Sequence, residues 1–142
     1  MKLITSKLEV KKSTLKGAGL GLFARVNFAK GERIVEYKGR LRLWREVKRE
    51  DGYNGYLLRV NRTMAIDALP TLGALGRYAN DARGLVRAPG TANNAEYVVD
   101  GLRCFIEAKR NIRQGEEVLV GYGSEYWKLM RKLRASAYSR KR

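Results

Sequence analysis

Short runs of apolar and β-branched residues recur along the chain between glycine-containing turns, and this pattern predicts a domain of many short strands. The runs cover residues 3–10, 33–37, 56–60, 64–68, 96–99, 103–107 and 117–122. Asp100-Gly101 lies between two of them and indicates a hairpin. Two further stretches, 44–50 and 124–137, have the apolar spacing of a helix, and the second begins at Ser124, a candidate N-cap. No repeat or linker divides the chain, so we expect one mostly β domain with little helix.

Charge adds a partner to this picture. Thirty Lys and Arg residues against fourteen Asp and Glu residues give a net charge of +16. Such an excess favours an anionic partner, most often nucleic acid, and the alternative is a surface that is merely solubilising. From Lys128 to Arg142 there are seven basic residues and no acidic one. This ending is a candidate helix extension, nuclear-import-like address or DNA-contacting tail.

Composition also excludes several kinds of site. The chain has no histidine, and Cys104 is its only cysteine, so an internal disulfide and a metal site built from Cys or His are excluded. A lone cysteine favours a reducing, intracellular compartment. No apolar stretch is long enough to span a bilayer, so we expect a soluble protein without a membrane partner and without a bound metal.

Two stretches are candidates for a ligand site. Gly17, Gly19 and Gly21 alternate within KGAGLGLFA, residues 16–24, and glycines at this density let the backbone approach a ligand. The stretch has neither the sequence of a phosphate loop nor the following helix of a dinucleotide site, and a plain β-turn is its alternative interpretation. Asn80-Asp81, in RYANDARG at residues 77–84, marks either a turn or the floor of a ligand site.

Five motifs in order decide between these interpretations. They are GLGLFA at residues 19–24, GE followed by EYKG at 31–39, IDA at 66–68, GALGRYANDA at 73–82 and AKRNIRQGEEVLVGYG at 108–123. Together they resemble the SET domain of protein lysine methyltransferases, over roughly residues 6–128. The resemblance is to compact single-domain members that lack zinc-binding cysteine clusters before and after the domain, such as the small viral SET proteins.

The resemblance implies a fold and a reaction. The fold is mostly β, with several small curved sheets, a knot-like C-terminal crossing and a short C-terminal helix, divided here into a SET domain at 1–128 and a basic helix or tail at 129–142. The cofactor implied is S-adenosylmethionine, which donates a methyl group to a lysine side chain. A lysine in an apolar, tyrosine-lined channel has its charged form disfavoured by desolvation and by the sulfonium, so no histidine is required.

The same resemblance assigns residues to roles. Tyr122 matches the family's essential tyrosine and is the catalytic candidate, while Tyr56, Val120 and Tyr126 match residues of the lysine channel. Val120, two residues before the essential tyrosine, is not a tyrosine and suggests room for more than one methyl group. The implied cofactor-binding residues are Ala18, Gly19, Leu20, Arg77, Asn80 and Asp81.

The chain departs from the family at the Asn80 motif. Asp81 and Ala82 stand where the family has histidine and serine, and Ala74 stands where it has asparagine. An ionised carboxylate only accepts hydrogen bonds, so we expect Asp81 to be paired with a donor, with Arg83 and Arg103 as candidates. Asn93 or Asn94 replaces the asparagine that follows shortly after this motif in the family.

Three functions remain open at this stage. The first is methylation of a histone lysine, in histone H3 and within nucleosomes, with DNA contacted by the basic surface and tail. The second is a non-catalytic or weakly catalytic SET-like chromatin or nucleic-acid-binding module, and the third is a methyltransferase of a basic non-histone protein. A nuclear location follows from the first, in an infected host cell if the source is viral. Some compact relatives pair, so a homodimer is a further candidate partner.

Overall fold

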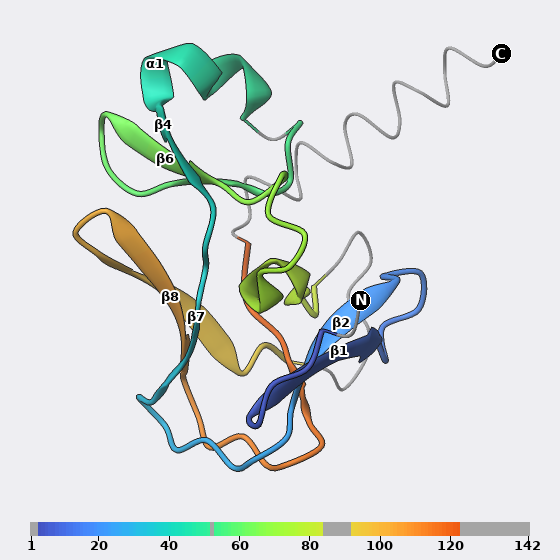
Figure 1. Ribbon diagram of the computed structural model, residues 1–142. Helices are drawn as coiled ribbons and strands as arrows, with labels where there is room; N and C mark the ends of the chain where they lie inside the picture. Colours follow the sequence, from blue (N-terminus) through green and yellow to red (C-terminus); the bar gives the residue numbers. More distant parts are fainter. Residues whose placement is uncertain (1–2, 52, 84–91, 123–142) are drawn as a thin grey trace, which may run out of the picture.

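The computed structural model describes residues 3–51, 53–83 and 92–122, and within them the chain forms small antiparallel sheets with few helices (Figure 1). The first sheet has the order β1-β2-β9, built from β1 (Leu8–Lys12), β2 (Leu20–Ala24) and β9 (Glu117–Val118). Its central strand is the second half of the glycine-rich stretch, which the sequence did not predict as a strand. The sheet therefore joins the two ends of the described chain.

The second sheet contains the predicted hairpin. Its order is β3-β8-β7, with β3 (Arg33–Glu36), β7 (Ala95–Asp100) and β8 (Arg103–Ala108). Strands β7 and β8 pair from Ala95↔Ala108 to Asp100↔Arg103, and Gly101 in the turn has φ +64°, a conformation that glycine adopts without strain. The prediction from Asp100-Gly101 is confirmed.

The third sheet and its helix form a unit at one end of the molecule (Figure 1). Its order is β4-β6-β5, with β4 (Arg40–Leu43), β5 (Leu57–Arg59) and β6 (Met64–Asp67). The short α1 (Trp44–Val47) and the 3₁₀ turn η1 (Lys48–Glu50) follow β4, as predicted for residues 44–50. We call residues 40–67 the β4–β6–β5 unit.

One glycine shows how closely the connection from β3 to β4 passes the end of β6. A Cβ atom on Gly39 would lie 2.5 Å from the carbonyl oxygen of Asp67, closer than real Cβ contacts. Only glycine allows the chain to pass there between β3 and β4, which explains the glycine of the EYKG motif.

The C-terminal part of the described chain crosses two other segments. Beyond β9, Leu119 forms a parallel bridge with Asn80, and Val120 forms one with Ala95. Residues 117–122 were predicted as one strand, but only Glu117 and Val118 belong to a sheet, because the next residues are bonded to two separate segments. This is the knot-like crossing expected from the resemblance, and the 3₁₀ turn η2 (Leu75–Tyr78), which the sequence did not predict, leads into it.

The core has two parts. The larger packs β1, β2, β8 and the crossing around Leu22, Phe28, Ile106 and Val120, and the smaller lies under the β4–β6–β5 unit around Tyr37, Ile66 and Cys104. Tyr97 packs against both parts. The predicted helix at 124–137 lies outside the described residues. Within the described part, no helix is long and apolar enough to cross a bilayer.

Candidate functional site

Tyr122 is fixed at both its backbone and its hydroxyl by the segment it crosses. Its Oη donates a hydrogen bond of 2.6 Å to the carbonyl of Ala79, and its N–H donates one of 2.9 Å to Oδ2 of Asp81. The side chain is half-buried and packs against the larger core. The catalytic candidate therefore has one fixed ring position beside the RYANDA motif.

Asp81 braces this crossing where the family has histidine. Its side chain is 4% exposed, and Oδ1 accepts hydrogen bonds from the N–H of Arg83 and from Nδ2 of Asn93, both at 2.9 Å. The predicted partner Arg83 is thus confirmed through its backbone. The other candidate, Arg103, is wrong, because its guanidinium pairs with Glu36 at 2.8 Å on the second sheet.

Asn80 joins the crossing to the glycine-rich stretch. Its Nδ2 donates to the carbonyl of Leu20 at 2.9 Å, and its own carbonyl accepts from the N–H of Val120 at 2.8 Å. Ala18 is half-buried, and Gly19 and Leu20 are exposed beside it. The structure therefore brings Leu20, Asn80 and Val120 into one place, as the predicted roles require.

The glycine-rich turn is shaped to leave one side open. Gly17 and Gly19 have φ of +78° and +73°, and a Cβ atom built on either would meet nothing within 4 Å. The N–H of Ser13 donates to the carbonyl of Gly19, which closes the turn. Exposed main-chain groups on an open turn fit the approach of a small polar ligand such as the methionine end of S-adenosylmethionine.

Glu117 is a site residue that the sequence analysis missed. It is 6% exposed, and Oε2 accepts from Ser13 Oγ at 2.7 Å and from Asn80 Nδ2 at 3.4 Å. Oε1 accepts from both the N–H and the hydroxyl of Thr14, at 2.9 and 2.6 Å. A side chain on Gly21 would collide with this carboxylate. Glu117 therefore ties the glycine-rich turn to the crossing, and its only signal in the sequence was a carboxylate next to the apolar run VLV.

The two asparagines of the displaced pair have different tasks. Asn93 holds Asp81 and accepts from the N–H of Ala82 at 2.8 Å. Asn94 is 2% exposed and bonds the crossing strand twice, donating to the carbonyl of Glu117 and accepting from the N–H of Leu119. Asn93 thus holds the segment of Asp81 and Ala82, and Asn94 holds the segment of Glu117 and Leu119.

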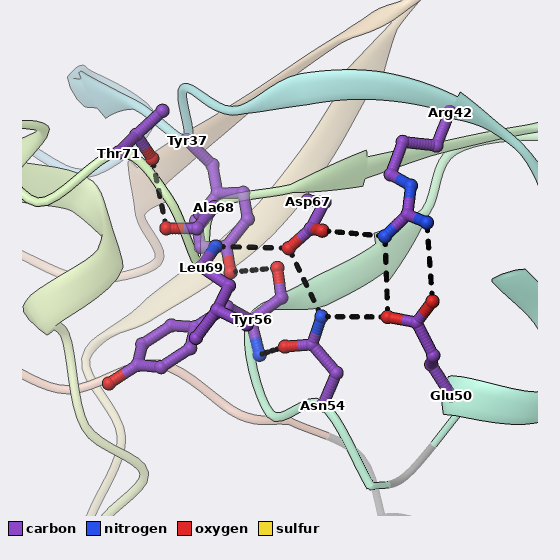
Figure 2. Close-up of polar contacts among 9 residues, drawn as sticks. All are labelled: Tyr37, Arg42, Glu50, Asn54, Tyr56, Asp67, Ala68, Leu69 and Thr71. Atoms are coloured by element: carbon purple, nitrogen blue, oxygen red, sulfur yellow. Dashed lines mark hydrogen bonds and ion pairs between the residues drawn. The ribbon is translucent and has the colours of Figure 1, made fainter.

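Tyr56, the predicted channel residue, is held by its backbone within the β4–β6–β5 unit. Figure 2 shows its N–H donating to Oδ1 of Asn54 at 3.0 Å, and its carbonyl accepting from Tyr37 Oη at 2.8 Å. The same carbonyl accepts from the N–H of Ala68 at 3.1 Å. Its ring is therefore presented from a fixed main chain.

Arg77 lies against this tyrosine. Its guanidinium carbon is 4.0 Å from the centre of the Tyr56 ring, and its side chain donates to the carbonyls of Ala68 and Leu69 at 2.9 and 3.2 Å. Arg77 is 8% exposed, so it is a buried cation held by a ring and carbonyl oxygens. Arg77 was predicted to bind the cofactor, and the structure places it in contact with Tyr56, which was predicted to line the lysine channel.

Two more tyrosines, not predicted for the site, connect the groups of Tyr56 and Tyr122. Tyr37 and Tyr97 meet edge to face with ring centres 5.5 Å apart, and Tyr97 also packs against the core that holds Tyr122. Burial raises the pKa of Tyr37 and of Tyr97 far above the ordinary value for tyrosine, so both phenols stay neutral. Tyr126 lies outside the described residues.

A carboxylate network lies beside the backbone of Tyr56 and is joined to it through Asn54 (Figure 2). Asp67 accepts from Arg42 at 2.9 Å, from Asn54 at 3.1 Å and from the N–H of Leu69 at 3.0 Å, and Glu50 binds the other side of Arg42. Burial raises the pKa of Asp67, but these three donors outweigh it, and the pKa lies below the ordinary value. The IDA motif thus contributes an ionised anchor for the turn that carries Tyr56.

This anchor predicts a pH dependence of stability. A depressed folded-state pKa means that the stabilisation by Asp67 is complete above the unfolded value of about 4 and is lost as pH falls through the folded value. We expect Asp67→Asn to lower the free energy of unfolding at pH 7. Below pH about 4, the difference in this free energy between the variant and the wild type should become smaller. Urea denaturation across this range measures it. Asp51→Asn, an exposed carboxyl on the same unit, should not show this pattern, and a gap that stays constant with pH would contradict the assignment.

The assembled groups are suited to orienting a substrate rather than to acid–base chemistry. Around Tyr122 and Asn80 the described residues offer phenols, amides and main-chain carbonyls, and the nearest carboxylates, Asp81 and Glu117, are occupied by donors of the fold. Such a set can position an amine and a polar ligand and restrict water.

Comparison with known proteins identifies the fold family. Residues 19–123 match the SET domain. Histone-lysine N-methyltransferase set-1 of Caenorhabditis elegans is 31% identical over 126 residues, covering 82% of this chain and 50% of that protein. N-lysine methyltransferase KMT5A of Xenopus tropicalis is 30% identical over 125 residues, covering 80% of this chain and 36% of that protein. The chain thus spans about a third of the length of KMT5A and half that of set-1.

A solved structure agrees with these relatives. A humanized mutant of the Chaetomium thermophilum Polycomb Repressive Complex 2, bound to the inhibitor GSK126, superposes with a TM-score of 0.62 at 28% identity. The match covers 82% of this chain and 15% of that one. The motifs, the crossing and these similarities together show that the chain belongs to the SET-domain family.

Proposed function

We propose that this SET domain transfers a methyl group from S-adenosylmethionine to the side chain of a histone lysine, with nucleosomes as its substrate. The observation that carries the proposal is the junction at Asn80. This residue bonds the glycine-rich turn through Leu20 and the crossing through Val120, while the adjacent Ala79 holds the hydroxyl of Tyr122. A ligand site on the turn and a catalytic tyrosine are thereby held in one rigid frame.

The cofactor residues follow from this frame. The exposed main chain of Ala18, Gly19 and Leu20 and the amide of Asn80 would hold the polar end of the cofactor, with Asp81 maintaining the crossing beneath. When bound, S-adenosylmethionine supplies an electrophilic methyl group on a sulfonium. Arg77 adds a buried cation beside Tyr56.

The remaining residues act on the lysine. Tyr122 and Tyr56 would flank the amine, with Tyr122 fixing the direction of its lone pair through the hydroxyl held by Ala79. The buried neutral tyrosines Tyr37 and Tyr97 make the surroundings poorly solvating, which disfavours the ammonium form. Val120 brings no hydroxyl to the position two residues before Tyr122, and we expect the amine there to accept a second or third methyl group.

The histone assignment rests on relatives and charge. The names of set-1 and KMT5A describe lysine methyltransferases, in the first case of histones. A chain of net charge +16 is repelled by a free basic tail and attracted to nucleosomal DNA, so nucleosomes should be the better substrate, with histone H3 as the target and the nucleus as the location.

Titration of the chain with S-adenosylmethionine in a calorimeter tests the proposal against its alternative. Saturable binding, weakened by Asn80→Ala, is the expected result, since the amide of Asn80 would contact the cofactor. Absence of binding would favour the second function, a SET-like module that binds chromatin without catalysis. Faster methylation of a basic non-histone protein than of nucleosomes would replace the histone assignment alone.

A further inference from the structure

The outer side of the β4–β6–β5 unit carries basic side chains that the proposed site does not use. Five of them, which we call the basic face, are exposed: Arg45, Lys48, Arg49, Arg59 and Arg62. Within the described part of the chain, none of the five forms an ion pair. Arg42 of the same unit, in contrast, is bound on both sides by carboxylates. The charge of Arg42 is thus neutralised within the fold, whereas the charges of the basic face are not.

Helical spacing places three of these residues together. Arg45 lies three residues before Lys48 and four residues before Arg49 over α1 and η1, so it is a neighbour of both along this segment. Val47 is fully buried, and Glu50 binds Arg42 on the sheet. Val47 and Glu50 are thus held by the rest of the fold, whereas the three basic residues are exposed.

The turn after β5 extends the basic face. The N–H of Trp44 donates to the carbonyl of Thr63 at 2.8 Å, which brings this turn to the start of α1 (Figure 1). The guanidinium of Arg59 lies 4.4 Å from the centre of the Trp44 ring and donates to the carbonyls of Asn61 and Arg62. Arg59 is therefore held in place by a ring and two carbonyls rather than by an acid.

The chemistry of the basic face favours phosphate. Guanidinium groups match phosphate oxygens in geometry and charge, and Glu46 and Asp51 are the only exposed acidic residues of α1, η1 and the residue after them. We infer that the basic face binds the phosphate backbone of duplex DNA. The inference rests on the proposed function in one respect: DNA held there lies on the same unit as Tyr56, so nucleosomal DNA would bring a histone lysine to the site.

Fluorescence anisotropy with a short labelled DNA duplex at several salt concentrations tests the inference. The variant Arg45→Gln/Lys48→Gln/Arg49→Gln is compared with Lys7→Gln/Lys12→Gln/Lys30→Gln, which removes the same charge from exposed, unpaired lysines outside the unit. We expect the slope of log affinity against log salt to fall by about 3 in the first variant. Its affinity at low salt should fall about 10-fold or more, against less than about 3-fold in the control. Thermal melts should show both variants folded, since all six side chains are exposed.

Equal losses in the two variants would overturn the inference, because binding would then follow total charge. Tighter binding of a matched RNA duplex would overturn the choice of DNA. Methylation of a free histone H3 peptide should not fall in the basic-face variant, because a less positive chain repels a basic peptide less, whereas nucleosome methylation should fall. If wild-type protein methylates neither substrate, the proposed function fails, and the anisotropy comparison still decides the DNA-binding surface.

Discussion

Tyr122→Phe is expected to lower kcat for methyl transfer on the order of 100-fold, the usual effect of removing one fixed hydroxyl at a reacting centre. The ring would keep its packing against the larger core, and the backbone N–H would keep its bond to Asp81. The hydroxyl and its 2.6 Å bond to Ala79 would be lost, which should cost about 1 kcal/mol of stability. Initial rates, cofactor binding and urea denaturation of one preparation separate these effects.

Tyr78→Phe is the matched control. The Tyr78 hydroxyl donates an equally short bond of 2.6 Å to the carbonyl of Leu72 and accepts a longer one of 3.3 Å from Arg77, so the variant loses at least as much hydrogen bonding as Tyr122→Phe. We expect near-normal rates. Similar losses of kcat in both variants would mean that Tyr122 acts through the fold and not on the substrate.

Glu117→Ala is expected to weaken both the fold and the binding of cofactor. It removes the acceptor of two hydroxyls and one N–H, from Ser13 and Thr14, in a buried position. Leaving the buried Ser13 hydroxyl without a partner, and losing the two bonds from the exposed Thr14, should lower the free energy of unfolding by about 2 kcal/mol. Because the glycine-rich turn would lose its attachment to the crossing, the affinity for S-adenosylmethionine should fall about 10-fold or more, equivalent to about 1.4 kcal/mol.

The neighbouring Glu116→Ala provides the comparison. Glu116 is more exposed and pairs with Arg110 at 3.3 Å, a surface contact worth at most about 1 kcal/mol. It should leave cofactor affinity unchanged. An unaltered affinity in Glu117→Ala would show that the turn keeps its shape without this carboxylate, and the role given to Glu117 would then be wrong.

Local signals were enough to predict part of this structure. Asp100-Gly101 predicted the β7–β8 hairpin because the two-residue turn needs a glycine at positive φ. The amphipathic run at 44–50 predicted α1 and η1. The motif order placed Asn80 and Tyr122, 42 positions apart in sequence, in one site, and the structure joins their neighbourhoods through Ala79 and Val120.

Other features could not be predicted because their causes are distant in sequence. Strand β2 was missed since Gly21 disfavours strands, yet the glycine is required by a carboxylate 96 positions later, at Glu117. Strand β4 was also missed. Its sequence RLRL contains two arginines, and the contact that holds one of them, Arg42, is with Asp67, 25 positions later in the sequence. Glu117 itself resembled any acid of a surface turn, and only the fold shows Ser13 and Thr14 beside it.

The central claim is that the frame of Asn80, the crossing and Tyr122 methylates a lysine. It is tested most directly by radiolabelled methyl transfer from S-adenosylmethionine to nucleosomes that carry single Lys→Arg changes in their histones. We predict incorporation by the wild-type chain that disappears with one specific histone H3 change and drops on the order of 100-fold with Tyr122→Phe. No incorporation into nucleosomes, free histones or other basic proteins, or equal incorporation with Tyr122→Phe, would contradict the account.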